Sequence, residues 1–328
     1  MMNVLVTGAS GFTGGNLCKH LINEGYNVTA LVRDIDKVND LRRAGVKLTL
    51  GDLRDKHTLN TAVKGIDIVF HIAALYRQAS ASKKDLWDVN VQGTKNILEA
   101  SENAGVKRLI HCSTVGVHGE IKNPPANESY PYAPGDAYQE SKTEGEKIAI
   151  EYMRKSIMHV IIVRPSGIHG PGDLRFLKLF KSIKKNRFIM IGDGKTLYHM
   201  VYIDDLIDGI LLCAKNDNAV GNIYILAGDK PITLNRLVEI IANCFKTKIP
   251  NFSLPFTPVY FLAFLVEILC IPLGIDPPLF RRRVDFFRKD RAFDISKAKR
   301  ELGYQPKVSL EHGIKLLSDW YKNNKFLC

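Results

Sequence analysis

The stretch that decides the fold is residues 3–15, NVLVTGASGFTGG. Its apolar, β-branched start predicts a buried strand at 3–7, and residues 16–24 have the pattern of an amphipathic helix. Between them, glycine permits a tight turn that brings backbone N–H groups close to phosphate, and the helix N-terminus attracts negative charge. The spacing is G-x-x-G-x-x-G, and its place between strand and helix predicts a dinucleotide site. The expected cofactor contacts are Gly8, Ser10, Gly11, Phe12, Thr13 and Gly14.

The end of the second expected strand indicates which dinucleotide binds. Residues 27–32 are followed by Arg33 and then Asp34. An arginine at this place suits a ribose 2′-phosphate, whereas a carboxylate suits a free 2′-hydroxyl. Because Arg33 comes first, the sequence favours NADP(H), with NAD(H) and a ribose contact from Asp34 as the alternative. Asp52 and Leu53 follow the third strand and are expected to border the adenine.

Strands alternate with helices over the first half of the chain. Strands are expected near 3–7, 27–32, 46–50, 67–72, 107–113 and 158–164, which predicts an α/β, Rossmann-type doubly wound parallel sheet over residues 1–165. Ligands gather at the carboxyl ends of such strands, where Ala73, Thr114, Pro165 and Ser166 fall. Residues 166–328 are expected to form mainly a smaller α/β substrate-binding domain, with the chain re-entering the sheet region near 201–213.

Tyr138 and Lys142 lie four residues apart in an expected helix over 137–152, so they share one helix face. A nearby ammonium stabilises the phenolate and lowers the phenol pKa from its usual value of about 10. The pair therefore provides an acid–base group that works near neutral pH. Ser113 and Thr114 end the preceding strand, where a hydroxyl can hydrogen-bond a substrate oxygen.

These features resemble the extended short-chain dehydrogenase/reductase family, and the resemblance spans nearly the whole chain. It rests on TGASGFTGG, GDL at 51–53, HIAA at 71–74, NVQGT at 90–94, CSTVGVHG at 112–119, YQESK at 138–142, RPSGIHGPG at 164–172, VYIDDL at 201–206 and FDISKAKRELGYQP. The resemblance implies a catalytic triad of Thr114, Tyr138 and Lys142, with Ser113 as a possible helper. The cofactor contacts expected from these motifs also include Ala73, Ala74 and Asn90.

Three branches of this family compete. Sugar-nucleotide dehydratases carry an Asp-Glu pair where this chain has Val115 and Gly116, which cannot move protons, so this branch is disfavoured. Sugar-nucleotide epimerases usually place an arginine where Tyr198 stands, and a tyrosine cannot replace a bidentate cation. The 3β-hydroxysteroid dehydrogenase-like and dihydroflavonol-reductase-like enzymes match RPSGIHGPG best. The sequence therefore favours interconversion of a secondary alcohol and a ketone, with an epimerase as the alternative.

A regulator that binds NADP without turnover remains a third class, disfavoured because Tyr138 and Lys142 are both present. The favoured substrate is an apolar alcohol or ketone. Its expected pocket is made of Tyr76, Arg77, His169, Arg175, Tyr198 and His199. The helices near 86–104 and 137–154 are where members of the family pair, so we expect a homodimer.

Composition limits the remaining possibilities. The six cysteines are scattered, no metal-ligand cluster is apparent, and no secretory signal begins the chain, which together suggest a cytoplasmic protein. The net charge is +12, and residues 281–300 supply +6 of it (nine Lys or Arg against three Asp). No nucleic-acid motif accompanies this charge, so no nucleic-acid partner is expected.

An apolar stretch at 252–275 precedes the basic window. It is broken by prolines and Glu267, and is shorter than the roughly 20 apolar residues of a membrane span. It is interpreted as a packed helix, a lid over an apolar substrate, or an interfacial helix that contacts a membrane together with residues 281–300.

Overall fold

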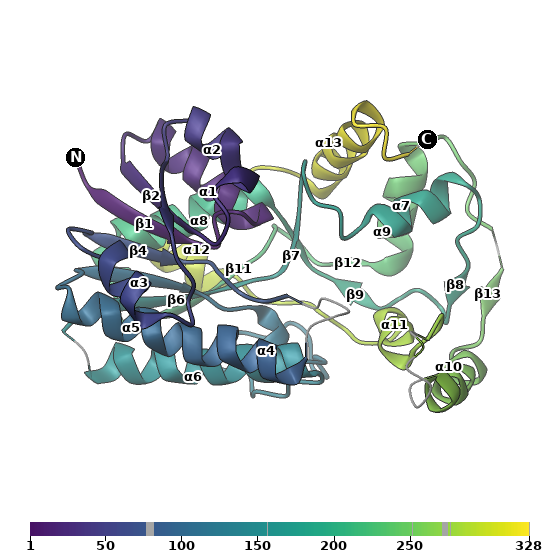
Figure 1. Ribbon diagram of the computed structural model, residues 1–328. Coiled ribbons are helices and arrows are strands. Elements are labelled where there is room, and N and C mark those ends of the chain that lie inside the picture. Colours follow the sequence, from purple (N-terminus) through teal and green to yellow (C-terminus); the bar gives the residue numbers. More distant parts are fainter. Residues whose placement is uncertain (77–81, 156, 251, 271–274, 276, 328) are drawn as a thin grey trace.

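The computed structural model describes residues 1–76, 82–155, 157–250, 252–270, 275 and 277–327. Seven parallel strands form its central sheet, in the spatial order β3-β2-β1-β4-β5-β6-β11 (Figure 1). The strands are β1 (Asn3–Thr7), β2 (Asn27–Val32), β3 (Lys47–Leu50), β4 (Ile68–His71), β5 (Arg108–Cys112), β6 (His159–Pro165) and β11 (Ile223–Leu226). The predicted Rossmann-type sheet is confirmed.

The central strands β4 and β5 are buried along their whole length because helices cover both faces of the sheet. One layer contains α1 (Phe12–Asn23), α2 (Asn39–Arg43), α8 (Ile203–Lys215) and α12 (Ser296–Leu302). The other contains α3 (Lys56–Ala62), α4 (Lys83–Trp87), α5 (Gly93–Asn103) and α6 (Ala137–Lys155). A π-helical turn, η2 (Asp88–Gln92), joins α4 to α5. The short 3-10 turns are η1 (Asp36–Val38), η3 (Val115–His118), η4 (Asp217–Ala219) and η6 (Asp285–Phe287).

A smaller assembly lies beyond the carboxyl ends of the strands. Its own apolar core gathers α7 (Leu177–Lys184), α9 (Leu234–Asn243) and α13 (Leu310–Asn323). Short paired strands surround this core: β7 (Gly167–His169) with β10 (Met200–Tyr202), β9 (Leu197–Tyr198) with β12 (Ile232–Thr233), and β8 (Met190–Ile191) with β13 (Ser253–Leu254). Helices α10 (Phe256–Cys270) and α11 (Arg281–Val284) lie side by side at its outer edge (Figure 1).

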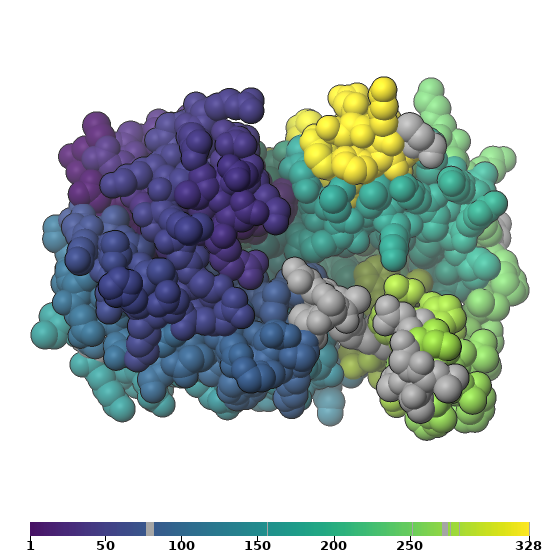
Figure 2. Space-filling model, in the orientation of Figure 1, coloured from purple at the N-terminus to yellow at the C-terminus, as the bar shows by residue number. Residues whose placement is uncertain are grey.

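The chain passes between the two parts more than once. Helix α8 covers the sheet where the sequence predicts a return near 201–213, and strand β11 then extends the sheet beside β6. Helix α12 returns a second time and packs on β11. Figure 2 shows the groove that separates the purple and blue N-terminal part from the teal and yellow C-terminal helices.

Candidate functional site

A cleft of about 1290 Å³ opens at the carboxyl ends of the central strands, between the sheet and the smaller assembly. It runs along β1, β2, β4, β5 and β6, at the place where parallel sheets of this kind bind ligands. Its walls include most of the residues that the sequence singles out: Gly8, Ser10, Gly11, Phe12, Thr13, Gly14, Arg33, Asp52, Leu53, Ala73, Ala74, Ser113, Thr114, Tyr138, Lys142, Pro165 and Ser166, with Tyr76, Arg175 and Tyr198.

The glycine turn is built so that no side chain fills its floor. A Cβ on Gly14 would lie 2.3 Å from the Gly8 carbonyl oxygen, and a Cβ on Gly8 would lie 2.7 Å from the Ala73 backbone. Gly8 also has a φ of +76°, a conformation that side chains rarely adopt. Helix α1 begins after Gly11 with no side-chain cap, so its first N–H groups face the cleft. The turn fits a dinucleotide pyrophosphate.

The far end of the cleft carries positive charge. Arg33 is exposed and lines the cleft, while Asp34 is not part of the lining and pairs with Lys37 at 3.0 Å. Asp52 receives two hydrogen bonds from the Arg54 side chain, at 2.9 and 2.7 Å. Those bonds outweigh burial and hold the Asp52 pKa below its usual value. Of these two neighbouring residues, Arg33 therefore faces the cleft and Asp34 does not.

Helix α6 brings Tyr138 and Lys142 to the cleft. Asp136 accepts a hydrogen bond from the Gln139 N–H at 2.9 Å and so fixes the first turn, which carries Tyr138. Lys142, one turn later, is buried, and its Nζ donates to the Cys112 carbonyl at 2.7 Å. Burial lowers the pKa of Lys142, because a charged ammonium is poorly solvated there. The Tyr138 ring packs edge-on against Tyr76, with centroids 5.0 Å apart.

The strand end after β5 supplies a hydroxyl. Thr114 Oγ1 accepts a hydrogen bond from the Gly116 N–H at 3.0 Å, which leaves its O–H to donate into the cleft. Ser113 is almost fully buried beside it. Val115 and Gly116 also line the cleft, so this wall offers no second acid–base group from those two positions.

A buried ion pair under the catalytic helix was missed by the sequence reasoning. Arg164, at the end of β6, donates to the Glu146 carboxylate on α6 at 2.6 Å, and both side chains are at most 2% exposed. Burial works to raise the Glu146 pKa, but the hydrogen bond and charge of Arg164, with hydrogen bonds from Ser113 and Tyr132, together hold that pKa below its usual value. Tyr132 and His118 complete this network. The two residues lie 18 positions apart in the chain, one on a helix and the other on a strand, so no local motif indicates the pair.

Several expected site residues lie elsewhere. Asn90 is buried behind the wall, where its amide holds the Leu75 backbone and the Ser141 hydroxyl, so it supports the cleft from outside. His169 is buried against Gly313, and burial lowers its pKa to about 4. His199 is buried too, bonded to the Gly228 carbonyl at 2.7 Å. Arg77 lies outside the described residues.

Tyr198 lines the cleft together with an arginine that sequence spacing did not reveal. Arg291 donates to the Tyr198 hydroxyl at 2.5 Å, and its guanidinium carbon lies 5.2 Å from the ring centroid. Arg291 therefore lies beside position 198, where sugar-nucleotide epimerases usually carry an arginine, although the two residues are 93 positions apart in the chain. Arg175, another expected substrate contact that lines the cleft, donates a hydrogen bond to Asp173 at 2.8 Å.

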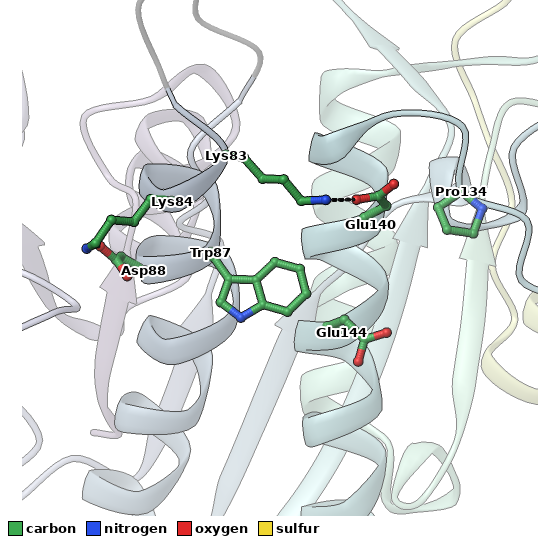
Figure 3. A pocket seen from close by; sticks show the side chains of 7 residues that line it. All are labelled: Lys83, Lys84, Trp87, Asp88, Pro134, Glu140 and Glu144. Atoms are coloured by element: carbon green, nitrogen blue, oxygen red, sulfur yellow. Dashed lines mark hydrogen bonds and ion pairs between the residues drawn. The ribbon is translucent and has the colours of Figure 1, made fainter.

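A second hollow of about 550 Å³ lies on the outside of α4 and α6, away from the cleft (Figure 3). Trp87, with 40% of its surface exposed, projects between Lys83 and Glu144, and Lys83 pairs with Glu140 at 2.9 Å. Of the residues that line this hollow, Trp87 and Asp88 lie at the start of the range 86–104, and Glu140 and Glu144 lie within 137–154, the two ranges where the sequence analysis expects a dimer contact.

The thiols and metal ligands add no chemistry to the cleft. Burial raises the pKa of Cys112 to about 11, so its thiol stays protonated beside Lys142. Within the described part of the chain, His, Cys, Asp and Glu side chains form no group that could hold a metal ion.

Fold and cleft together define a Rossmann-type enzyme that works with a nicotinamide dinucleotide. The chain belongs to the NAD dependent epimerase/dehydratase family, whose model matches residues 4–227. It is 33% identical to the 3beta-hydroxysteroid-dehydrogenase/decarboxylase isoform 1 of Arabidopsis thaliana, over 87% of this chain and 69% of that one.

The chain is also similar to an epimerase and to a solved structure. The chain is 30% identical to the N-acetyl-alpha-D-glucosaminyl-diphospho-ditrans,octacis-undecaprenol 4-epimerase of Escherichia coli O157:H7, over 95% of this chain and 93% of that one. The crystal structure of gox2253 superposes with a TM-score of 0.86 and 29% identity, covering all of both chains. Dehydrogenases and epimerases both occur among the relatives, so the family does not itself choose between net oxidation and epimerisation.

Proposed function

We propose that this enzyme interconverts a secondary alcohol and a ketone on an apolar substrate, with NADP(H) as the favoured cofactor. The observation that carries the proposal is the cleft itself. Tyr138, Lys142 and Thr114 meet on the wall that faces the glycine turn, and the neighbouring positions Val115 and Gly116 add no further acid or base. One proton-moving group is what alcohol oxidation requires.

The residues divide the work as follows. In the oxidation direction, the Tyr138 phenolate accepts the hydroxyl proton of the substrate, and in reduction the phenol returns it. Lys142, one helical turn away, favours the phenolate through its positive charge. Thr114 donates to the reacting oxygen and fixes its position. A nicotinamide dinucleotide whose pyrophosphate is held at the glycine turn would supply the acceptor or donor of hydride.

A single assay separates the two reactions that the family allows. Purified protein is given NADP⁺ or NAD⁺ with either hydroxysteroids and polycyclic alcohols or UDP-sugars, and both reduced nicotinamide and products are measured. We expect stoichiometric reduced cofactor and ketone from the apolar alcohols. Inverted sugar stereochemistry without net reduced cofactor would overturn the proposal.

The second candidate is a sugar epimerase, and Arg291 is the observation that favours it. Its guanidinium lines the cleft and is held by Tyr198 and the Lys289 carbonyl, with neutral groups as the recorded hydrogen-bond partners. A cation so placed can bind a diphosphate. Arg291→Gln should abolish turnover of UDP-sugars if this candidate is right, and leave turnover of apolar alcohols nearly unchanged if it is not.

We also propose that the enzyme is a homodimer, paired through the face of α4, α5 and α6 that carries Trp87. The exposed indole and its charged neighbours are what a polar-rimmed interface with an aromatic centre requires.

A further inference from the structure

Helix α10 leaves its most apolar face uncovered. Phe261, Leu262, Leu265, Ile268 and Leu269 are between 41% and 68% exposed. They recur at intervals of one, three and four residues, so they form one stripe along the helix. Soluble proteins rarely expose a continuous apolar surface of this kind unless it binds something.

The opposite face of α10 contacts other parts of the protein, so the exposed stripe faces outward. Glu267 accepts from the Arg281 backbone N–H at 2.7 Å and from its Nε at 2.6 Å. The Arg281 guanidinium also lies 4.9 Å from the Phe264 ring centroid. Arg288 lies in the same way over Phe256, at 5.1 Å, and Ala263 is fully buried.

Around α10, the arginine side chains are more exposed than the carboxylates with which they pair. The Glu267 and Asp285 side chains are 14% exposed, whereas their partners Arg281 and Arg288 are 42% and 48% exposed. Arg283 is exposed as well and stacks on Phe280 at 4.5 Å. The surface around α10 and α11 is therefore cationic, because these three exposed arginines outnumber the two largely buried carboxylates.

An apolar stripe with exposed arginines beside it matches the surface of an anionic lipid bilayer. We propose that α10 and α11 dock the enzyme on an anionic membrane, with α10 lying in the plane of the interface. No helix in the described ranges is long and apolar enough to cross a membrane. Fifteen residues of α10 span about 22 Å, shorter than the roughly 30 Å hydrocarbon core.

The inner face of α10, opposite the docking stripe, lines the catalytic cleft. Tyr260 and Glu267 of α10, with Arg281 of α11, line the same cleft as Tyr138. A substrate that leaves the bilayer at α10 would therefore enter the cleft along the inner face of this helix before it reaches Tyr138. This route rests on the proposed function, whereas the docking does not.

The first test measures binding alone. Full-length protein is sedimented with phosphatidylcholine vesicles that contain or lack phosphatidylglycerol. We expect binding to the anionic vesicles, weakened by salt, and a loss of about tenfold or more for Leu262→Glu/Leu269→Glu. Ile157→Glu is the matched control, because Ile157 is 96% exposed and lies just before β6, at the end of that strand away from the cleft. Arg283→Gln should weaken binding to anionic vesicles about fivefold.

Three results would overturn the docking. They are no binding of the wild type to either vesicle, equal binding by the Leu262→Glu/Leu269→Glu variant, or a wild-type oligomer that this variant dissociates without any vesicle binding. The last would assign the stripe to a second copy of the chain. Tyr138→Phe should bind vesicles like the wild type, so a failed reaction and a failed docking are told apart.

The second test measures the route. A hydroxysteroid is offered either in cyclodextrin or in anionic vesicles. Leu262→Glu/Leu269→Glu should keep wild-type kcat/KM with cyclodextrin and lose about tenfold with vesicles. An equal loss in both conditions would show that the stripe serves the fold or the cleft rather than substrate entry.

Discussion

Tyr138 differs from phenylalanine by one oxygen atom, so its role can be removed with little change in packing. Tyr138→Phe keeps the ring that contacts Tyr76 and removes the group that moves the proton. We expect kcat to fall about 10²- to 10⁴-fold, while cofactor affinity, measured by fluorescence titration, stays within about threefold. A variant that keeps wild-type kcat would show that another group carries the proton.

Lys142 couples activity to a cost in stability. Burial lowers its pKa, so the folded state holds the charged ammonium less well than water does. Lys142→Met should therefore lose turnover yet unfold at the same or a higher temperature at pH 7. The sign follows from linkage, since the unfolded state binds the Lys142 proton more tightly than the folded state does.

The stability advantage of Lys142→Met should be full below the folded pKa of Lys142 and shrink as the pH rises toward about 10.4, the unfolded value. Thermal unfolding of both proteins across alkaline pH measures this difference. A variant that is less stable than the wild type at every pH would mean that the hydrogen bond to Cys112 outweighs the cost of burial.

Arg33 and Asp34 are adjacent in the chain but separated by the structure. Arg33 lines the cleft, and Asp34 turns to Lys37. Arg33→Asp should lower the ratio of NADP to NAD affinity about 10- to 100-fold, because a guanidinium bond to phosphate is replaced by repulsion. Asp34→Asn is the matched control and should leave the ratio unchanged. A shift from Asp34→Asn alone would assign the ribose to the carboxylate.

At the scale of secondary-structure elements, the Glu146–Arg164 pair fixes helix α6, and hence Tyr138 and Lys142, against strand β6. Glu146→Gln leaves the buried guanidinium without its counter-charge, so we expect a loss of about 3 kcal/mol of unfolding free energy at pH 7. Chemical denaturation of the two proteins measures the difference.

The same pair predicts a pH dependence. The folded Glu146 pKa is lowered, so its stabilisation is present above the unfolded value of about 4.3 and is lost as the pH falls through the folded value. The gap between wild type and Glu146→Gln should therefore close in acid. A gap that stays constant down to low pH would mean that packing, and not charge, sets the cost.

Elements with a strong local pattern could be predicted from the sequence, and elements defined by distant partners could not. The strand at 3–7 is a mainly apolar, β-branched run before a glycine turn, and it appears as β1 with those bounds. Strand β11 is only four residues, IYIL, and becomes a strand because it pairs with β6 across the sheet. The apolar stretch at 252–275 left a packed helix, which the sequence favoured, a lid and an interfacial helix as alternatives, because periodicity cannot say which face a helix turns outward.

At the scale of the whole molecule, the cleft is assembled from segments that only the fold brings together. The glycine turn and the Tyr-Lys pair were recognisable because each lies within one short motif. Arg291 was not, since it reaches Tyr198 through a bridge between two segments 93 residues apart. Asn90 lies in one of the motifs, yet its side chain supports the wall of the cleft from behind. The motif therefore predicted where the residue lies in the chain but not the direction in which its side chain points.

The same assembly predicts how the enzyme responds when the proposed homodimer dissociates. Every expected catalytic residue that lines the cleft comes from one chain, while Trp87 lies on the outer side of α4. Trp87→Glu should raise the dimer dissociation constant about 30-fold or more, because a buried indole at an interface centre is replaced by a charge. Sedimentation velocity measures this shift, with Ile157→Glu as the exposed control.

The Trp87→Glu monomer should keep kcat within about threefold, since its proposed acid–base group is complete within one chain. A wild type that sediments as a monomer at all concentrations would refute the dimer, and an inactive monomer would show that pairing of α4 and α6 is needed to hold Tyr138 in place.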